Sequence, residues 1–129
     1  MAAVPSRIKS FAPQLLVDDI DRAVAFYRDV LGFSFGAPWQ GFYAIGERDG
    51  FAVHLKCAPK TIADRDHRRR EQHLDVYADV TGIDALYEAC RKGATIVKPL
   101  APTPWGTRDF YAADPDGYIL AFGESGKSE

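Results

Sequence analysis

Residues 16–33 read LVDDIDRAVAFYRDVLGF, and this stretch decides the fold of the chain. Asp18 or Asp19 can cap a helix that runs to about Leu31, and Gly32 supplies its end. The apolar residues of the run recur at the i, i+3, i+4 spacing that places side chains on one face of a helix. These apolar residues are Ile20, Ala23, Val24, Tyr27 and Leu31.

Strands are predicted on both sides of this helix. The segment 11–17 precedes it, and Pro13 places that strand at the edge of a sheet or beside another chain. Arg48-Asp49-Gly50 predicts a tight turn, because glycine takes a positive φ without steric cost. Three short strands are predicted around this turn, at 33–35, 42–47 and 51–57.

The same order of elements begins again after a polar, loop-like segment at 58–72. Residues 73–78 alternate as a strand, Thr81 can cap a second helix with Asp84 three residues on, and Gly93 ends that helix. Further strands are predicted at 95–98, 108–113 and 118–122, and Asp114-Pro115-Asp116-Gly117 predicts a type I turn between the last two.

The chain therefore predicts an α+β fold of two β-α-β-β-β modules in one domain over residues 1–129. The first repeat covers about 11–57, a loop covers 58–71, and the second repeat covers about 72–124. A four-stranded sheet with one helix leaves its other face bare, so two such sheets are expected to pair. We expect this pairing to form a cleft between the sheets, with the helices on the convex side.

Composition and charge exclude several function classes. The net charge of −2 and a basic run at 65–70 that acidic residues interrupt argue against a nucleic-acid-binding protein. The N-terminal segment has no apolar core of a secretory signal, and no stretch predicts a membrane span. Cys57 and Cys90 form no CxxC motif and are expected to be reduced. We therefore expect a cytoplasmic protein.

Three segments carry a resemblance to a known family. Residues 16–27, Leu31-Gly32-Phe33 and Asp114-Pro115-Asp116-Gly117-Tyr118 resemble the vicinal oxygen chelate superfamily, which includes glyoxalase I, bleomycin-resistance proteins and extradiol dioxygenases. Pro13 and Pro104-Trp105-Gly106 resemble the bleomycin-resistance branch in particular. That resemblance implies a homodimer whose chains exchange N-terminal strands and share two ligand clefts.

The resemblance also gives the positions of a metal site. Superfamily members that use a metal take four ligands from the first and last strands of the repeats, which here correspond to Ala12, His54, His73 and Ala121. Two of these positions keep an imidazole and two carry methyl groups, whereas a catalytic metal site generally needs three protein ligands. Gln14 can substitute for Ala12 only if the strand register shifts. We therefore predict no cofactor.

Candidate ligand contacts combine this alignment with side-chain chemistry. Both histidines are expected to face the cleft, and Asp75 either orients an imidazole or pairs with a cationic ligand, or is an ordinary acid held by water. Aromatic side chains offer stacking surfaces to planar organic ligands, and Trp105 in its Pro-Gly loop is the best single candidate. The predicted ligand contacts are His54, His73, Trp105, Trp39, Asp75, Phe42 and Tyr111.

The leading functional hypothesis is a protein that binds and sequesters a small aromatic or drug-like molecule without chemistry, as in antibiotic resistance. A near-neutral chain argues against bleomycin itself, because that ligand is cationic. The alternative is a metal-dependent lyase, isomerase or dioxygenase that uses His54 and His73. A non-catalytic partner-binding domain is a third possibility. Whether the chain is an enzyme stays open, with no catalytic residue predicted.

Overall fold

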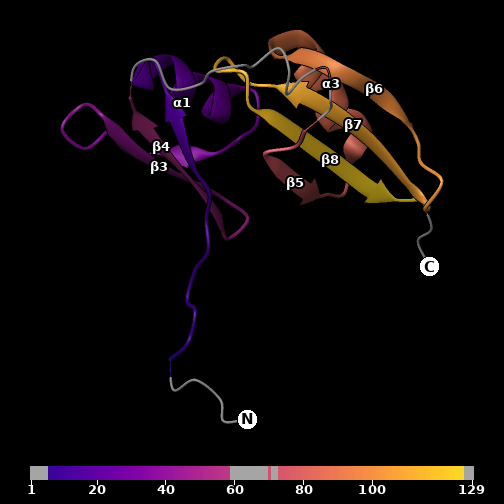
Figure 1. The fold of residues 1–129 in the computed structure, drawn as a ribbon, viewed down its shortest axis with the longest axis horizontal. Helices are drawn as coiled ribbons and strands as arrows, with labels where there is room; N and C mark the ends of the chain where they lie inside the picture. The colour runs from indigo at the N-terminus through magenta and orange to yellow at the C-terminus, as the bar shows by residue number, and fades with distance from the viewer. Residues whose placement is uncertain (1–5, 59–69, 71–72, 127–129) are drawn as a thin grey trace.

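The chain folds into two modules of the same design that lie side by side (Figure 1). The computed structural model describes residues 6–58, 70 and 73–126. In the first module the strands are hydrogen-bonded in the order β1-β4-β3-β2, with β1 parallel to β4 and the other pairs antiparallel. Its elements are β1 (Gln14–Val17), α1 (Ile20–Asp29), β2 (Ser34–Phe35), β3 (Tyr43–Arg48) and β4 (Phe51–Cys57).

The second module repeats this order as β5-β8-β7-β6, again with its first strand parallel to its last. Its elements are β5 (Val76–Asp79), α3 (Ile83–Gly93), β6 (Thr95–Pro102), β7 (Thr107–Ala113) and β8 (Ile119–Ser125). The two mixed sheets, each with one helix, confirm the predicted α+β fold of paired β-α-β-β-β modules. Within the described ranges, no helix combines the length and the hydropathy that crossing a membrane requires.

Helix α1 begins and packs as the sequence predicts. Asp19 is its N-cap, and the Asp19 carboxylate accepts a hydrogen bond of 3.0 Å from the Arg22 amide. The helix ends at Asp29, earlier than predicted, and Gly32 takes a φ of 80° in the turn that follows. All five apolar residues of the predicted face are buried, namely Ile20, Ala23, Val24, Tyr27 and Leu31.

Several strand boundaries differ from the predictions, because pairing with neighbouring strands sets where a strand ends. Strand β1 begins at Gln14 rather than at residue 11, and β5 begins at Val76, so His73 precedes the strand instead of starting it. Strand β6 continues to Pro102, since an edge strand tolerates prolines. Most of the predicted loop at 58–71, with its arginine run, lies outside the described residues.

The predicted cap of the second helix is wrong. The N-cap of α3 is Gly82, which has a left-handed backbone conformation with a φ of 72°. Glycine has no side chain, so the cap residue itself makes no capping hydrogen bond. The Ile83 amide instead donates to the Glu124 carboxylate at 3.0 Å. Thr81 therefore does not cap this helix, because an acceptor from β8 takes that place at the helix N-terminus. A local sequence pattern cannot predict a partner that is so distant in the chain.

The turn between β7 and β8 connects the two modules. Asp116, which is 0% exposed, accepts a hydrogen bond of 2.9 Å from the Asp18 amide, and Arg22 Nη2 lies 3.4 Å from the same oxygen Oδ1. The Tyr118 hydroxyl accepts a hydrogen bond of 2.9 Å from the Leu16 amide. These partners lie in β1, in α1 and between them, so the turn of the second module holds the start of the first.

Asp114 completes this inter-module contact. Its Oδ1 accepts the amide hydrogens of Asp116 and Tyr118, both at 2.9 Å, and its Oδ2 accepts the Tyr27 hydroxyl hydrogen at 2.7 Å. Burial raises the pKa of the Asp114 carboxyl to about 6, although the three hydrogen bonds to it act in the opposite direction. The predicted turn is confirmed by the hydrogen bond of 3.0 Å from the Gly117 amide to the Asp114 carbonyl.

We predict that Asp114 makes stability depend on pH in a direction unusual for an aspartate. Its pKa of about 6 in the folded chain lies above the ordinary 3.8, so its contribution is complete below pH 3.8 and is lost as the pH rises through 6. Urea unfolding of wild type and Asp114→Asn should show a difference in unfolding free energy that is about 2–3 kcal/mol more favourable to wild type at pH 4 than at pH 7.5. A difference that does not change with pH contradicts this assignment.

Candidate functional site

Each sheet packs one face against its helix and leaves the other face without a helix among the described residues (Figure 1). In the first sheet, Leu15 and Leu55 point into the core and are at most 5% exposed. Side chains that alternate with them lie on the opposite side. The strand register places Gln14 and Ile45 on either side of His54. We call Gln14, Tyr43, Ile45 and His54 the module-1 face.

A chain of hydrogen bonds crosses the module-1 face. Gln14 Nε2 donates to the Tyr43 hydroxyl at 2.9 Å, and the Tyr43 hydroxyl lies 2.7 Å from His54 Nδ1. Either the Tyr43 hydroxyl or His54 Nδ1 can be the donor of the second bond, because a hydroxyl oxygen has two lone pairs and can accept from both neighbours. With the hydroxyl as donor, Nδ1 accepts and the neutral ring carries its hydrogen on Nε2. In that tautomer the module-1 face presents an N–H donor.

Aromatic rings extend this face toward the segment before β3. The ring centroids of Tyr43 and His54 are 5.6 Å apart, those of Phe42 and Tyr43 are 6.3 Å apart, and those of Trp39 and Phe42 are 5.5 Å apart. All three pairs meet edge to face, a favourable geometry for aromatic rings. This aromatic row (Trp39, Phe42, Tyr43 and His54) brings together three of the predicted ligand contacts.

The second sheet has a corresponding open face. The register places Tyr77 and Tyr111 on either side of Ala121, while Phe110 on the other side of β7 is fully buried in the core. The Lys98 ammonium lies 5.1 Å from the centroid of the Tyr111 ring. The structure thus decides which side of β7 is open. We call Tyr77, Asp109, Tyr111, Ala121 and Gly123 the module-2 face.

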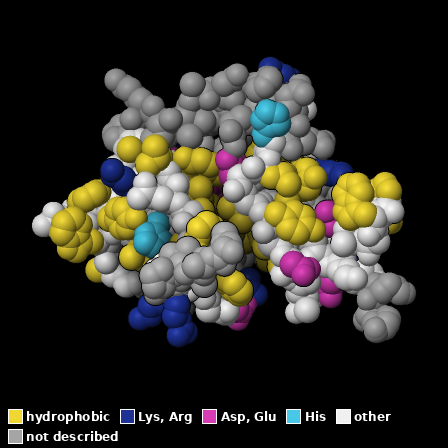
Figure 2. Space-filling view, turned by 60° about the horizontal axis from the view of Figure 1, so that its bottom comes forward, with side chains coloured by type: hydrophobic (Ala, Val, Ile, Leu, Met, Phe, Trp, Pro, Cys, Tyr) yellow, Lys and Arg dark blue, Asp and Glu magenta, His cyan; other side chains and the backbone are white. Residues whose placement is uncertain are grey.

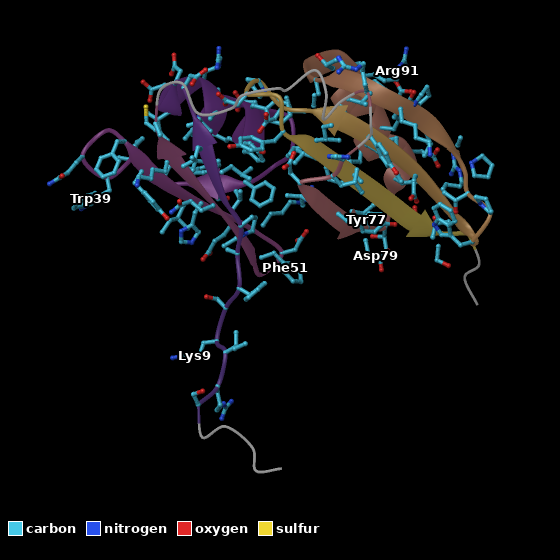
Figure 3. All side chains as sticks on the ribbon, in the orientation of Figure 1. Lys9, Trp39, Phe51, Tyr77, Asp79 and Arg91 are labelled. Carbon is cyan, nitrogen blue, oxygen red and sulfur yellow. The ribbon has the colours of Figure 1, made fainter. Side chains whose placement is uncertain are left out.

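The other predicted contacts lie apart from the aromatic row. The Asp75 carboxylate accepts a hydrogen bond of 2.8 Å from the Ile119 amide, so it secures the start of β8. His73 is exposed and lies before β5. Trp105 is 69% exposed in the turn between β6 and β7. That turn lies at the end of the molecule opposite to Trp39, as β6 and β7 in Figure 1 and the labelled Trp39 in Figure 3 show. One chain therefore does not bring the two tryptophans together.

A groove of about 840 Å³ runs between the modules. Hydrophobic side chains gather in two groups on the face shown in Figure 2, with acidic side chains beside one group. Tyr77 and Phe51 line the groove, whereas none of the seven predicted ligand contacts does. Its other lining residues include Phe11 and Pro13 of the N-terminal segment and the edge strand β5.

Comparison with known proteins identifies the family. The model of the Glyoxalase/Bleomycin resistance protein/Dioxygenase superfamily matches residues 7–122. The chain belongs to this superfamily. A bleomycin resistance protein of Geobacillus stearothermophilus is 31% identical over 138 aligned positions, which cover 90% of this chain and 96% of that protein. A bleomycin resistance protein of Staphylococcus aureus matches with the same identity and coverage.

Solved structures of the superfamily share the fold. A glyoxalase-related enzyme from Clostridium phytofermentans superposes with a TM-score of 0.73 and 22% identity, covering 94% of this chain and 98% of that one. TioX from Micromonospora sp. ML1 superposes with a TM-score of 0.71 and 22% identity, covering 91% and 98%. At these identities the likeness shows the fold alone, and the resemblance read from the sequence motifs is confirmed by the family match.

The residues present do not fit the four-ligand metal site of the superfamily. The strand register places Gln14 beside His54 and Tyr77 beside Ala121. Ala12 therefore does not pair with His54, and His73 does not pair with Ala121. Within the described part of one chain, no three His, Cys, Asp or Glu side chains come close enough to hold a metal ion.

Two residues of the site were not among the predicted contacts. The Tyr43 hydroxyl links Gln14 to His54. Tyr77 follows His73 and Asp75 at intervals of two residues, so the sequence predicts that the three share one side of a strand. Only the strand register shows that Tyr77 lies beside Ala121. Period-two alternation identifies both as face residues, whereas their partners depend on strand pairing.

We predict that Tyr43 sets the tautomer of His54. Long-range ¹H–¹⁵N spectra of the wild type at neutral pH should show His54 protonated on Nε2 and unprotonated on Nδ1, because Nδ1 accepts the Tyr43 hydrogen bond. Tyr43→Phe removes that donor and should give a mixture of both tautomers. A wild-type ring protonated on Nδ1 would contradict the hydrogen-bond directions described above.

Proposed function

We propose that this protein binds and sequesters a small, flat, aromatic or drug-like molecule in the cytoplasm, without chemistry, in clefts that a homodimer completes. The aromatic row on the module-1 face is the observation that carries this proposal. Rings arranged edge to face leave ring surface for stacking, and the His54 N–H beside them offers a single directed hydrogen bond. A flat ligand with a carbonyl or similar acceptor oxygen suits that combination.

The relatives support the same reading. The curated relatives at 31% identity are named bleomycin resistance proteins, a name that denotes resistance to a drug. Ordered rings and hydrogen bonds on an open face favour binding over catalysis, because the His54 imidazole, which could act as a base, is already engaged through Nδ1 by the Tyr43 hydroxyl. Fold alone does not decide the chemistry, so the argument depends on these side chains.

The proposed dimer explains the N-terminal segment. Residues 6–13 leave the body of the molecule (Figure 1), and Ile8 and Phe11 are 80% and 89% exposed. Large apolar side chains on an extended segment are typical of a contact with another chain. Strand β5 is an edge strand, and it lines the groove together with Phe11 and Pro13 of this segment.

We predict that the module-1 face binds a flat carbonyl compound through His54. Flavone, a neutral flat ketone, should quench the tryptophan fluorescence of the wild type and bind more tightly than 2-phenylnaphthalene, which has no acceptor oxygen. His54→Leu should weaken flavone binding about five- to tenfold, the usual value of one neutral hydrogen bond, and leave 2-phenylnaphthalene binding unchanged. Asp21→Asn, an exposed change on helix α1, is the control.

Two results would contradict the proposal. If no planar aromatic compound in such a screen binds the wild type, the sequestering function fails. If purified protein contains stoichiometric divalent metal that His54→Ala and His73→Ala both remove, the metal-dependent alternative replaces it.

We predict that the N-terminal segment holds the dimer together. Light scattering after size exclusion should give a dimer for the wild type and mostly monomer for Ile8→Ser/Phe11→Ser, because the substitutions remove apolar contact area. Lys9→Ser is the matched control, since Lys9 lies on the same segment (Figure 3) and carries no large apolar surface. A wild-type monomer, or an unchanged dimer in the double variant, overturns the strand exchange.

A further inference from the structure

Tyr77 occupies a special position in the module-2 face. It lies on strand β5 directly beside Ala121, as Gln14 lies beside His54 in the first module. The Tyr77 side chain is 49% exposed, while Ala121 beside it is 0% exposed. The sheet beside Tyr77 is covered at this point, since the Tyr77 hydroxyl lies over Gly123. Tyr77 is therefore a half-exposed ring at the edge of the module-2 face.

A buried carboxylate lies at the hydroxyl end of the Tyr77 ring. The Tyr77 hydroxyl and Asp109 Oδ1 both lie over Gly123, and Asp109 is only 2% exposed. The Thr107 hydroxyl donates to Asp109 Oδ1 at 2.7 Å, and Thr103 Oγ1 lies 2.9 Å from Thr107 Oγ1. A buried acid is costly unless such donors satisfy it, so Asp109 and the hydroxyls are fixed together.

Gly123 is the residue that allows this arrangement. A Cβ atom at Gly123 would overlap the Tyr77 hydroxyl and crowd Asp109 Oδ1. The Tyr77 side chain therefore lies across the backbone of β8, with its hydroxyl over Gly123. A ring that turned away from the sheet would lose this close packing of its hydroxyl against Gly123.

The two tyrosines of this face differ in charge environment. Tyr111 has the Lys98 ammonium over its ring. Tyr77 instead has two carboxylates as neighbours, since Asp79 and Asp109 both pair with Gly123 and lie on its side of the sheet. Figure 3 shows Tyr77 and Asp79 together on this edge of the second module. A cation over the Tyr77 ring would be attracted by the ring and by both carboxylates.

We propose that Tyr77 is the stacking residue that selects a planar, positively charged ring, with Asp109 as its positioning residue and the exposed Asp79 as the neighbouring charge. The inference rests on the proposed binding function, and it names the ligand class. The net charge of −2 does not attract cations strongly at long range, so selection at this face is local.

Proflavine, a planar cation at pH 7.5, and 2-aminoanthracene, a neutral planar amine of similar size, test this inference by titration. We expect the wild type to bind proflavine at least tenfold more tightly. Tyr77→Leu should weaken proflavine binding about five- to tenfold. Asp79→Asn should lower the preference for proflavine about threefold, whereas Asp21→Asn, which makes the same charge change on helix α1, should leave the preference unchanged. Thermal melting verifies that each variant is folded.

Asp109 is tested by two variants that separate position from charge. Asp109→Asn keeps an acceptor for the Tyr77 hydroxyl and should retain most of the affinity for the neutral amine, whereas Asp109→Val should lose it. The inference is overturned if the wild type binds proflavine and 2-aminoanthracene with equal affinity. It is also overturned if Tyr77→Leu binds proflavine as tightly as the wild type does. If flavone still binds in a His54-dependent manner in that case, the inference fails and the proposed function stands; if neither dye nor flavone binds, both fail.

Discussion

The burial of the Asp114–Tyr118 turn against the first module is the constraint on which the rest of the structure depends. Asp116 is 0% exposed, and it meets the Asp18 amide and the Arg22 guanidinium at the start of α1. Its second oxygen has no hydrogen-bond partner among the described residues, so this carboxylate tolerates burial only while the first contacts persist. Because one turn holds both β1 and α1, it sets the position of one module relative to the other.

The same physical device recurs on the two open faces. On the module-1 face, Gln14 and Tyr43 orient the imidazole of His54. On the module-2 face, Asp109 orients the ring of Tyr77 across Gly123. In both cases a polar chain fixes an aromatic ring that remains accessible, so little side-chain freedom is left to lose when a ligand binds. The two faces differ in polar character, since the module-1 face carries the His54 imidazole and the module-2 face places carboxylates beside the Tyr77 ring.

Local sequence patterns predicted the elements well and their partners poorly. The α1 cap at Asp19, its five-residue apolar face and the turn at Asp49-Gly50, whose residues have φ of 55° and 86°, depend on neighbours in sequence, and all three are confirmed. The α3 cap was wrong because its acceptor, Glu124, is 41 residues away from Ile83. Likewise, the Asp75 carboxylate accepts a hydrogen bond from the Ile119 amide, and no local sequence pattern predicts that contact.

The sequence by itself determined the repeated order of strands and helices, because periodicity and turn residues are local properties, and its motifs were enough to show the resemblance to the superfamily. Only the tertiary structure decided that Gln14 lies beside His54 and Tyr77 beside Ala121. It also decided that the β6–β7 turn, which contains Trp105, lies at the end of the molecule opposite to Trp39. The physical reason is strand register: a shift of one or two residues leaves the sequence pattern nearly unchanged but replaces every neighbour across the sheet.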